Sequence, residues 1–195
     1  MDWMTFWTAI AGVATSSAVG VALKDVLYPP KLKVAIPNQI GELTELTHGG
    51  KFIDLTRYYY LEVANTRRAL SRPAHKAQLF LLRLELLQPQ RGEWVGTVPI
   101  RWLSHEHVPK ARTVGPTVDC DFVRVVKGTP ALELLPAFRP NNLHTLWTTA
   151  CVFIAHVQAR SNEVDSDVVA FRVTWDGQWH DDAETMHAHL QIDEA

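Results

Sequence analysis

The chain has 195 residues and a formal net charge of −2, from 19 basic and 21 acidic side chains. The charges form no block of one sign, so the sequence indicates neither a nucleic-acid-binding segment nor a polybasic segment that contacts lipid. Its two cysteines, Cys120 and Cys151, fit no metal-ligand spacing. An extracellular domain would let them join in a disulfide, whereas a cytoplasmic one would keep both reduced.

The chain begins with an uncharged run from Trp3 to Leu23. A helix of about this length crosses a bilayer core of roughly 30 Å. Trp3, Trp7 and Tyr28 stand near its two ends, where aromatic rings favour the membrane interface. We therefore expect residues 1–27 to form one transmembrane helix. A cleaved signal peptide and a soluble or interfacial helix are the alternatives, although the basic flank of a signal peptide is missing.

Small residues recur at every fourth position of this run, at Thr8, Gly12, Ser16 and Gly20. Such a ridge lets two membrane helices approach closely and pack backbone against backbone. The alternative is chance, because the whole segment is rich in small residues. The ridge predicts that the helix self-associates and that the protein is a homo-oligomer.

The charges that flank the helix predict its orientation. No lysine or arginine precedes it, whereas Lys24, Lys31 and Lys33 follow it closely. Cytoplasmic flanks carry the excess of basic residues. We expect a single-pass protein of the inner (plasma) membrane with its C-terminal domain in the cytoplasm.

Beyond the helix, apolar and polar residues alternate with a period of two, which predicts β-strands. The expected strands are Lys31–Ile36, Phe52–Asn65, Gln78–Leu87, Trp94–Trp102, Asp119–Val126, Leu132–Ala137, Trp147–Arg160 and Val168–Trp175. A helix is the alternative for Gln78–Leu87, because leucine, glutamate and arginine are good helix formers. Residues 41–50 are expected to form a loop, and Pro99 is expected on an edge.

The same alternation assigns side chains to faces. In Phe52–Asn65, Tyr59, Leu61 and Val63 share one face, and in the last strand Val169, Phe171, Val173 and Trp175 point inward. Strict alternation over Gln78–Leu87 groups Leu82 with Leu84 and Leu86. In the expected strand Asp119–Val126, alternation groups Arg124 with Cys120 and Phe122. It places Asp119 and Asp121 toward solvent.

Seven or eight short strands without intervening helices predict an antiparallel sandwich or barrel. Of these we expect an all-β, immunoglobulin-like β-sandwich over residues 38–180, with a linker and first strand over 28–37. Residues 181–195 would form an acidic tail or a short helix, since the acidic side chains at 181, 182 and 184 favour a helix N-terminus.

One stretch, Tyr58–Glu85, reads as a strand ending in V-x-N, a short turn, a small residue and a strand of alternating hydrophobic residues. These positions are held by Val63, Asn65, Ala74, Leu79 and Leu81. The stretch resembles the cell-adhesion-related immunoglobulin-like domains of bacteria. The later VTWDGQW, Val173–Trp179, is similar to the closing strand of small bacterial membrane-anchored sandwich proteins. The resemblance implies a binding scaffold and brings no catalytic residues.

The most ligand-like cluster is His105, Glu106 and His107. In a strand the two histidines would face the same way and share a metal ion. A solvated loop is the alternative reading of these residues. No nucleophile elbow, P-loop or dinucleotide fingerprint occurs, so we expect no enzyme and no cofactor. The alternative function is a metal-dependent hydrolase that uses this cluster.

The densest basic loop holds Arg67, Arg68 and Arg72. It would meet an acidic partner, a phosphate group or lipid headgroups, or else form a solvated turn. Together these features predict a membrane-anchored, non-enzymatic binding or sensor module. Its ligand would be a protein or a small molecule and not a nucleic acid. By analogy at the level of the fold, a self-associating effector in bacterial stress or phage defence fits this architecture.

Overall fold

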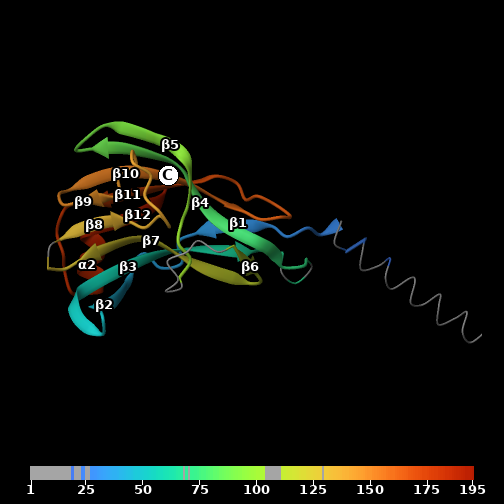
Figure 1. Cartoon of the computed structure of the whole chain (residues 1–195), viewed down its shortest axis with the longest axis horizontal. Helices are drawn as coiled ribbons and strands as arrows, with labels where there is room; N and C mark the ends of the chain where they lie inside the picture. The colour runs from blue at the N-terminus through green and yellow to red at the C-terminus, as the bar shows by residue number, and fades with distance from the viewer. Residues whose placement is uncertain are drawn as a thin grey trace, which may run out of the picture.

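The computed structural model describes residues 19, 23–24, 27–67, 69, 71–103, 111–128 and 130–195. These residues form two antiparallel β-sheets of six strands each, which enclose a shared core (Figure 1). The expected all-β class with a sandwich of antiparallel sheets is confirmed. The described residues form twelve strands, more than the seven or eight that the alternation predicted.

The first sheet is built on β3, whose two edges are both paired. Its strand order is β1-β3-β7-β8-β9, and β2 pairs with the remaining part of the β3 edge that β1 uses. The strands are β1 (Leu32–Ala35), β2 (Glu42–His48), β3 (Lys51–Asn65), β7 (Thr117–Val126), β8 (Ala131–Leu134) and β9 (Leu146–Trp147).

The second sheet is built on β4 and β10. Its strand order is β12-β11-β10-β4-β5, and the short β6 pairs with the beginning of β4. The strands are β4 (Ala74–Gln88), β5 (Gly92–Pro99), β6 (Arg112–Val114), β10 (Cys151–Arg160), β11 (Val169–Trp175) and β12 (Leu190–Glu194).

The chain passes from the second sheet to the first directly after β5. The N–H of Ile100 still donates to the carbonyl of Leu79 in β4 at 2.8 Å. Two residues later, Trp102 pairs with Cys120 in β7. Pro99 ends β5, which is an edge strand, so its missing N–H leaves no ladder bond unmade. This crossing links the two sheets along one side of the sandwich.

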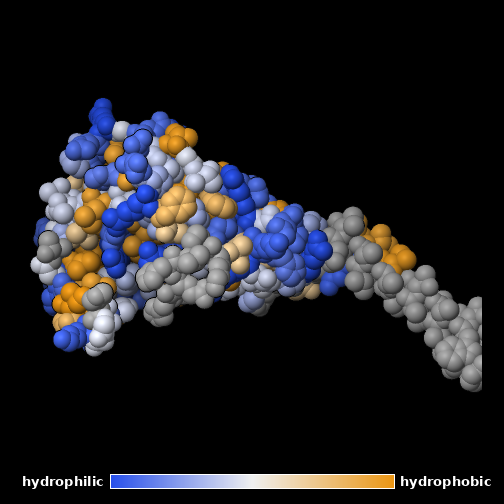
Figure 2. All heavy atoms as spheres, viewed as in Figure 1, coloured by the Kyte–Doolittle hydropathy of each residue, from blue (hydrophilic) through white to orange (hydrophobic). Residues whose placement is uncertain are grey.

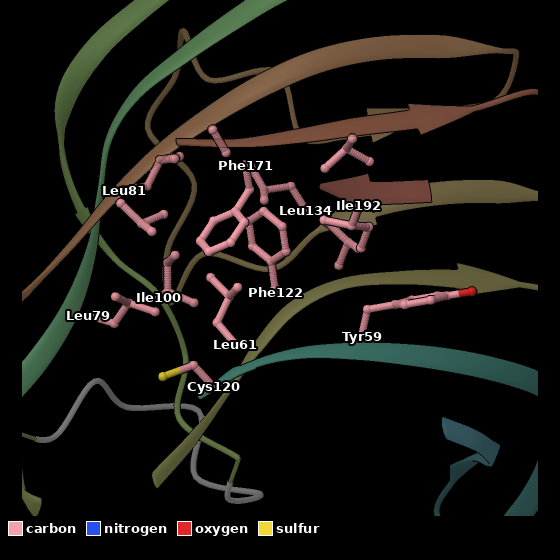
Figure 3. Packing of buried hydrophobic residues seen from close by; sticks show 14 of the residues in the cluster. Tyr59, Leu61, Leu79, Leu81, Ile100, Cys120, Phe122, Leu134, Phe171 and Ile192 are labelled. Carbon is pink, nitrogen blue, oxygen red and sulfur yellow. The ribbon is translucent and has the colours of Figure 1, made fainter. Parts of the chain in front are cut away.

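Aromatic rings from the two sheets meet in the core. The ring centroids of Phe122 in β7 and Phe171 in β11 lie 6.0 Å apart at a tilt of 59°. Figure 3 shows these two rings between aliphatic side chains that come from both sheets. Trp147 in β9 stacks on Phe153 in β10 at 4.5 Å. Such pairs add attraction beyond the burial of apolar area, so the sheets share one continuous core.

Alternation predicted the buried face correctly in the regular strands. Tyr59, Leu61 and Val63 of β3 are fully buried. Phe171 and Val173 of β11 are buried as well, while the residue between them, Arg172, is exposed.

The strict alternation predicted for β4 is wrong, because the strand contains a β-bulge. Arg83 pairs with His156 and Leu81 pairs with Val157, so Leu82 has no counterpart in β10. One extra residue shifts every later side chain to the other face. Leu81 and Leu84 are therefore both fully buried, although a period of two places them on opposite faces.

A second bulge corrects the prediction for β7. Tyr59 pairs with Val123 and Tyr60 with Asp121, so Phe122 is the extra residue. The extra residue Phe122 and the next residue, Val123, are both fully buried, although a period of two places them on opposite faces. Asp121 is only 8% exposed, so the expectation that it faces solvent is wrong.

The loop expected over residues 41–50 is wrong for most of its length. Strand β2 occupies Glu42–His48 and pairs with β3. Most of its described side chains are exposed, so apolar and polar residues do not alternate along it. Only Gly49 and Gly50 form the expected turn, with φ of +58° and +74°.

The end of the chain, residues 181–195, contains the short helix α2 (Ala183–His189) and then β12. Asp182 caps the helix, because its side chain accepts a hydrogen bond from the N–H of Thr185 at 2.8 Å. Leu190 and Ile192 of β12 are buried, and β12 pairs with β11. This segment is thus part of the second sheet.

Most of the transmembrane helix expected over residues 1–27 lies outside the described residues. Val19, Leu23, Lys24 and Leu27 are described and are helical. Across the described part of the chain, no helix combines the length and the apolar content that crossing a bilayer requires.

Candidate functional site

A hollow of about 510 Å³ opens on the outer face of the second sheet, where the β4–β5 hairpin adjoins β10 and β11. This volume lies in the usual range for small-molecule sites. Its charged lining residues are Arg83, Glu85, Arg91, Glu93 and Arg172. A smaller hollow of about 190 Å³ adjoins it and shares Leu86 and Gln88.

A network of charged side chains forms one wall of this hollow. Glu85 and Glu93 stand directly opposite each other in the β4–β5 ladder, where two like charges repel. Arg83 joins them: its Nη1 lies 3.3 Å from Glu85 Oε1, and its Nε donates to Glu93 Oε1. His156 Nε2 lies 2.6 Å from the same Glu85 oxygen. Arg83 is therefore engaged by two carboxylates and held in place.

Two other arginines of the hollow are not engaged in this way. Arg91 lies in the hairpin turn, and Arg172 projects from the outer face of β11; both are exposed. Neither makes an ion pair or a side-chain hydrogen bond with any described residue. A guanidinium group presents a planar set of donors that matches carboxylate and phosphate oxygens. The hollow therefore carries two unengaged cations beside a fixed polar wall.

Sequence reasoning did not find this site. Its signal was the presence of Arg83 and Glu85 inside the apolar run over Gln78–Leu87. Charged residues in such a run indicate that one face of the strand points to solvent. The bulge at Leu82 decides which face that is, and the sequence pattern did not reveal the bulge.

The predicted basic loop is the turn between β3 and β4. Arg67 and Arg72 are exposed there, while Arg68 lies outside the described residues. Thr66 joins this turn to the start of the domain, because its N–H donates to the carbonyl of Lys31 at 2.9 Å. The turn thus lies beside the point where the N-terminal segment enters the sandwich.

Two other predicted sites fall outside the described residues. These are the metal cluster of His105, Glu106 and His107, and the helix ridge of Thr8, Gly12, Ser16 and Gly20. Among the residues that are described, no three histidine, cysteine or acidic side chains are placed to hold a metal ion. The metal site and the packing ridge stay predictions.

The outer face of the first sheet carries a different charged cluster. Arg124 donates to Glu133 Oε2 at 2.6 Å through its Nε, and its Nη1 lies 3.1 Å from the hydroxyl of Tyr58. Arg139 also donates to Glu133. Each cation of this cluster already has a carboxylate partner, so the cluster offers less to a ligand than Arg91 and Arg172 do.

The two cysteines are free thiols buried in the core. Burial raises the pKa of Cys151 to about 12. Burial also raises the pKa of Cys120 well above its usual value, and the charges of Asp121 and Asp119 add to this effect. Because the thiolate is the reactive form, neither residue is a candidate nucleophile.

No family model, curated protein or solved structure matches this chain.

Proposed function

We propose that this protein is a non-enzymatic, single-pass membrane protein whose immunoglobulin-like β-sandwich binds a small anionic ligand. One observation carries this proposal: the exposed guanidinium groups of Arg91 and Arg172 border a hollow of about 510 Å³ without a partner among the described residues. A carboxylate or phosphate group is the chemistry that such groups recognise.

The rest of the hollow suits this ligand class. Glu85 and Glu93 outnumber Arg83 by one charge, and Arg91 and Arg172 bring the five charged residues of the hollow to a net charge of +1. The fixed wall keeps Arg83 from competing for the ligand. Leu86 and Val152 also line the hollow and would contact the apolar body of the ligand.

The membrane anchor is supported by the described residues of the N-terminal segment. Val19, Leu23 and Leu27 are four apart, so they lie along one side of a helix. They are 53%, 52% and 64% exposed. A stripe of exposed large apolar side chains marks a surface that contacts a membrane or another protein. We place this helix in the plasma membrane, with the sandwich in the cytoplasm.

Self-association through the ridge at Thr8, Gly12, Ser16 and Gly20 completes the proposal. Ligand binding to the sandwich would change the clustering of the helices, as in a membrane effector. A role in bacterial stress or phage defence rests on analogy at the level of the fold alone.

Alkaline carbonate extraction of membranes that contain the full chain tests the anchor. An integral protein stays in the membrane pellet, and this is the expected result. Recovery of the full chain in the wash would contradict the anchor.

Titration of the full chain in uncharged detergent micelles tests the hollow. Inorganic phosphate and succinate are added at constant ionic strength, with chloride as the reference anion. In NMR spectra, the backbone amide resonances of Gly92 and Val152, which line the hollow, are expected to shift in a saturable way. Shifts no larger than those in chloride would contradict the ligand class.

Two variants locate the effect. Arg91→Ala combined with Arg172→Ala is expected to abolish saturation, whereas the corresponding lysine substitutions keep the charge and weaken binding. Lys51→Ala removes an exposed cation at the start of β3 and is the control. Equal binding by the alanine pair and the wild type would place the ligand elsewhere.

A further inference from the structure

Exposed cations from three separate segments meet at one end of the sandwich. Lys31 and Lys33 lie at the start of the domain, Arg67 and Arg72 in the β3–β4 turn, and Lys76 near the start of β4. All five side chains are exposed. We call these five residues the basic end.

Hydrogen bonds hold the segments of the basic end together. The side chain of Asn65 accepts from the N–H of Lys31 and from the N–H of Arg67, each at 3.2 Å. Its amide group donates to the carbonyl of Arg72 at 3.2 Å. The cations are therefore carried by a fixed backbone frame.

The basic end is also the end from which the N-terminal segment leaves. Pro30 and Leu32 are buried, so the chain is anchored in the sandwich immediately before Lys33. In Figure 1 the described residues 27–31, which lead into β1, lie at this end, away from the β2–β3 hairpin. Figure 2 shows hydrophilic side chains gathered on the same end of the domain.

Acidic residues at this end are partly engaged by other groups. Glu163 accepts the N–H of His75 at 2.8 Å, and Asp165 lies 4.0 Å from Arg160. Glu62 is half-buried in β3. The exposed charge of the basic end is therefore mainly positive.

We propose that the basic end docks onto anionic lipid headgroups and sets the orientation of the sandwich on the membrane. This inference rests on the proposed membrane anchor. Leu23 and Leu27 are helical residues that precede the basic end in the chain, and both are exposed and apolar. An apolar surface is thus followed along the chain by a basic surface, which matches the order of lipid tails and anionic headgroups in a membrane. The cytoplasmic leaflet carries the anionic lipids, which agrees with the predicted cytoplasmic orientation.

Lipid is the occupant that this arrangement favours. A cation near an anionic membrane surface improves partitioning by roughly fivefold, and the attraction acts over about 10 Å at ordinary salt. The five cations come from segments that are hydrogen-bonded together beside the point where the chain enters the sandwich, so they would face a surface next to that point together. A free phosphate ion would engage one or two of these groups and would not need all three segments.

The test compares the full chain in two kinds of vesicle, pure phosphatidylcholine and an equimolar mixture with phosphatidylglycerol. Amide hydrogen exchange is measured for residues 31–33 and 66–76. We expect exchange of both segments to be several-fold slower in the anionic vesicles, and we expect high salt to remove the difference. Equal exchange in the two kinds of vesicle would overturn the proposal.

Charge reversal distinguishes lipid binding by the basic end from a general effect of the charge of the protein. Lys31→Glu, Lys33→Glu and Lys76→Glu are combined, and the arginines of the turn are left in place. This variant should lose the lipid-dependent protection. Lys51→Glu is the control, because Lys51 lies at the far end of β3, about 45 Å from Asn65 for a strand of fifteen residues. A similar loss of protection in the control would overturn the proposal.

Two further arms distinguish other causes. Inorganic phosphate added to phosphatidylcholine vesicles is expected to give no protection; if it reproduced the protection, a free anion would be the occupant and the proposal would fail. Carbonate extraction is carried out on both kinds of vesicle. Loss of the chain from both kinds would contradict the anchor itself, whereas retention without a lipid effect would contradict the basic end alone.

Discussion

Asn65 Oδ1 accepts a hydrogen bond from the backbone N–H of Lys31 at 3.2 Å, across a sequence separation of 34 residues. Asn65 is only 2% exposed. The same side chain also fastens the β3–β4 turn, through the N–H of Arg67 and the carbonyl of Arg72. One buried amide thus holds Lys31, at the start of the domain, beside the β3–β4 turn.

Replacing Asn65 by alanine is expected to lower the free energy of unfolding by about 3 kcal/mol, because several partly buried polar groups lose their partner together. Asn65→Asp keeps the accepting oxygen but places a buried negative charge against the carbonyl of Arg72, so it should destabilise the protein as well. Urea denaturation of the full chain in micelles measures both variants. A loss below about 0.5 kcal/mol for the alanine variant would contradict this role.

Gly41 is required for two reasons at once. Its φ is +67°, and a Cβ there would lie 2.8 Å from the carbonyl oxygen of Tyr58 and 2.9 Å from the ring of Tyr59. Gly41→Ala is expected to cost about 3 kcal/mol, since the strain of the left-handed backbone adds to the clash. Gly49 shares the positive φ but has open space around it. Gly49→Ala should therefore cost only about 1 kcal/mol, and equal losses would contradict the clash.

The sequence pattern predicted the regular strands because burial on one face leaves a period of two. In β10 and β11, Phe153 and Val173 are both buried, and the two residues pair with each other. The pattern failed at Leu82 and Phe122, where bulges shift the period by one residue. A bulge depends on the pairing partner, so its position is a property of the sheet and not of one strand.

The candidate sites were harder to predict for a related reason. Neither the net charge nor any run of basic residues predicted a lipid-binding surface. Lys31, Arg67 and Lys76 are separated in sequence and meet only when β1, β3 and β4 are in place. The hollow likewise joins Arg91 of a turn to Arg172 of β11. Such convergence is set by the strand order, which no local pattern encodes.

Arg57 connects β3 to the C-terminal segment, and it is only 3% exposed. Its Nη2 donates to the carbonyl of Asp181 at 2.8 Å, and its Nη1 to the carbonyl of Ile40 at 3.2 Å. Arg57→Met should lower the free energy of unfolding by about 2 kcal/mol, because both carbonyls lose a donor. Hydrogen exchange around α2 should be faster in this variant.

Lys127→Ala is the control for this prediction. Lys127 Nζ lies 2.7 Å from the side chain of Asp181, so the variant removes a contact with the same residue from the solvent side. Little change in stability or exchange is expected, because exposed ion pairs are strongly screened. If Lys127→Ala loosened the segment as much as Arg57→Met, the buried arginine would not be the connection.

Tyr59 is fully buried, and its hydroxyl has no hydrogen-bond partner among the described residues. A buried polar group without a partner opposes folding. Tyr59→Phe removes this group and keeps the ring, so at neutral pH the variant is expected to be as stable as the wild type or up to about 1 kcal/mol more stable. Tyr58→Phe is the control, because the Tyr58 hydroxyl lies 3.1 Å from Arg124 Nη1 and its loss should destabilise the protein slightly.

The advantage of Tyr59→Phe should also grow at alkaline pH. Burial raises the pKa of Tyr59 from 10.0 to about 12, against a smaller lowering effect of Arg57. Between these values the unfolded chain releases the phenol proton and the folded protein retains it, so the wild type loses stability as pH rises. The phenylalanine variant lacks this loss, and the gap should widen by about 2 kcal/mol from pH 10 to pH 12. Urea denaturation across this range measures the gap, and a gap that stays constant would show that Tyr59 ionises as readily in the folded protein as in the unfolded chain.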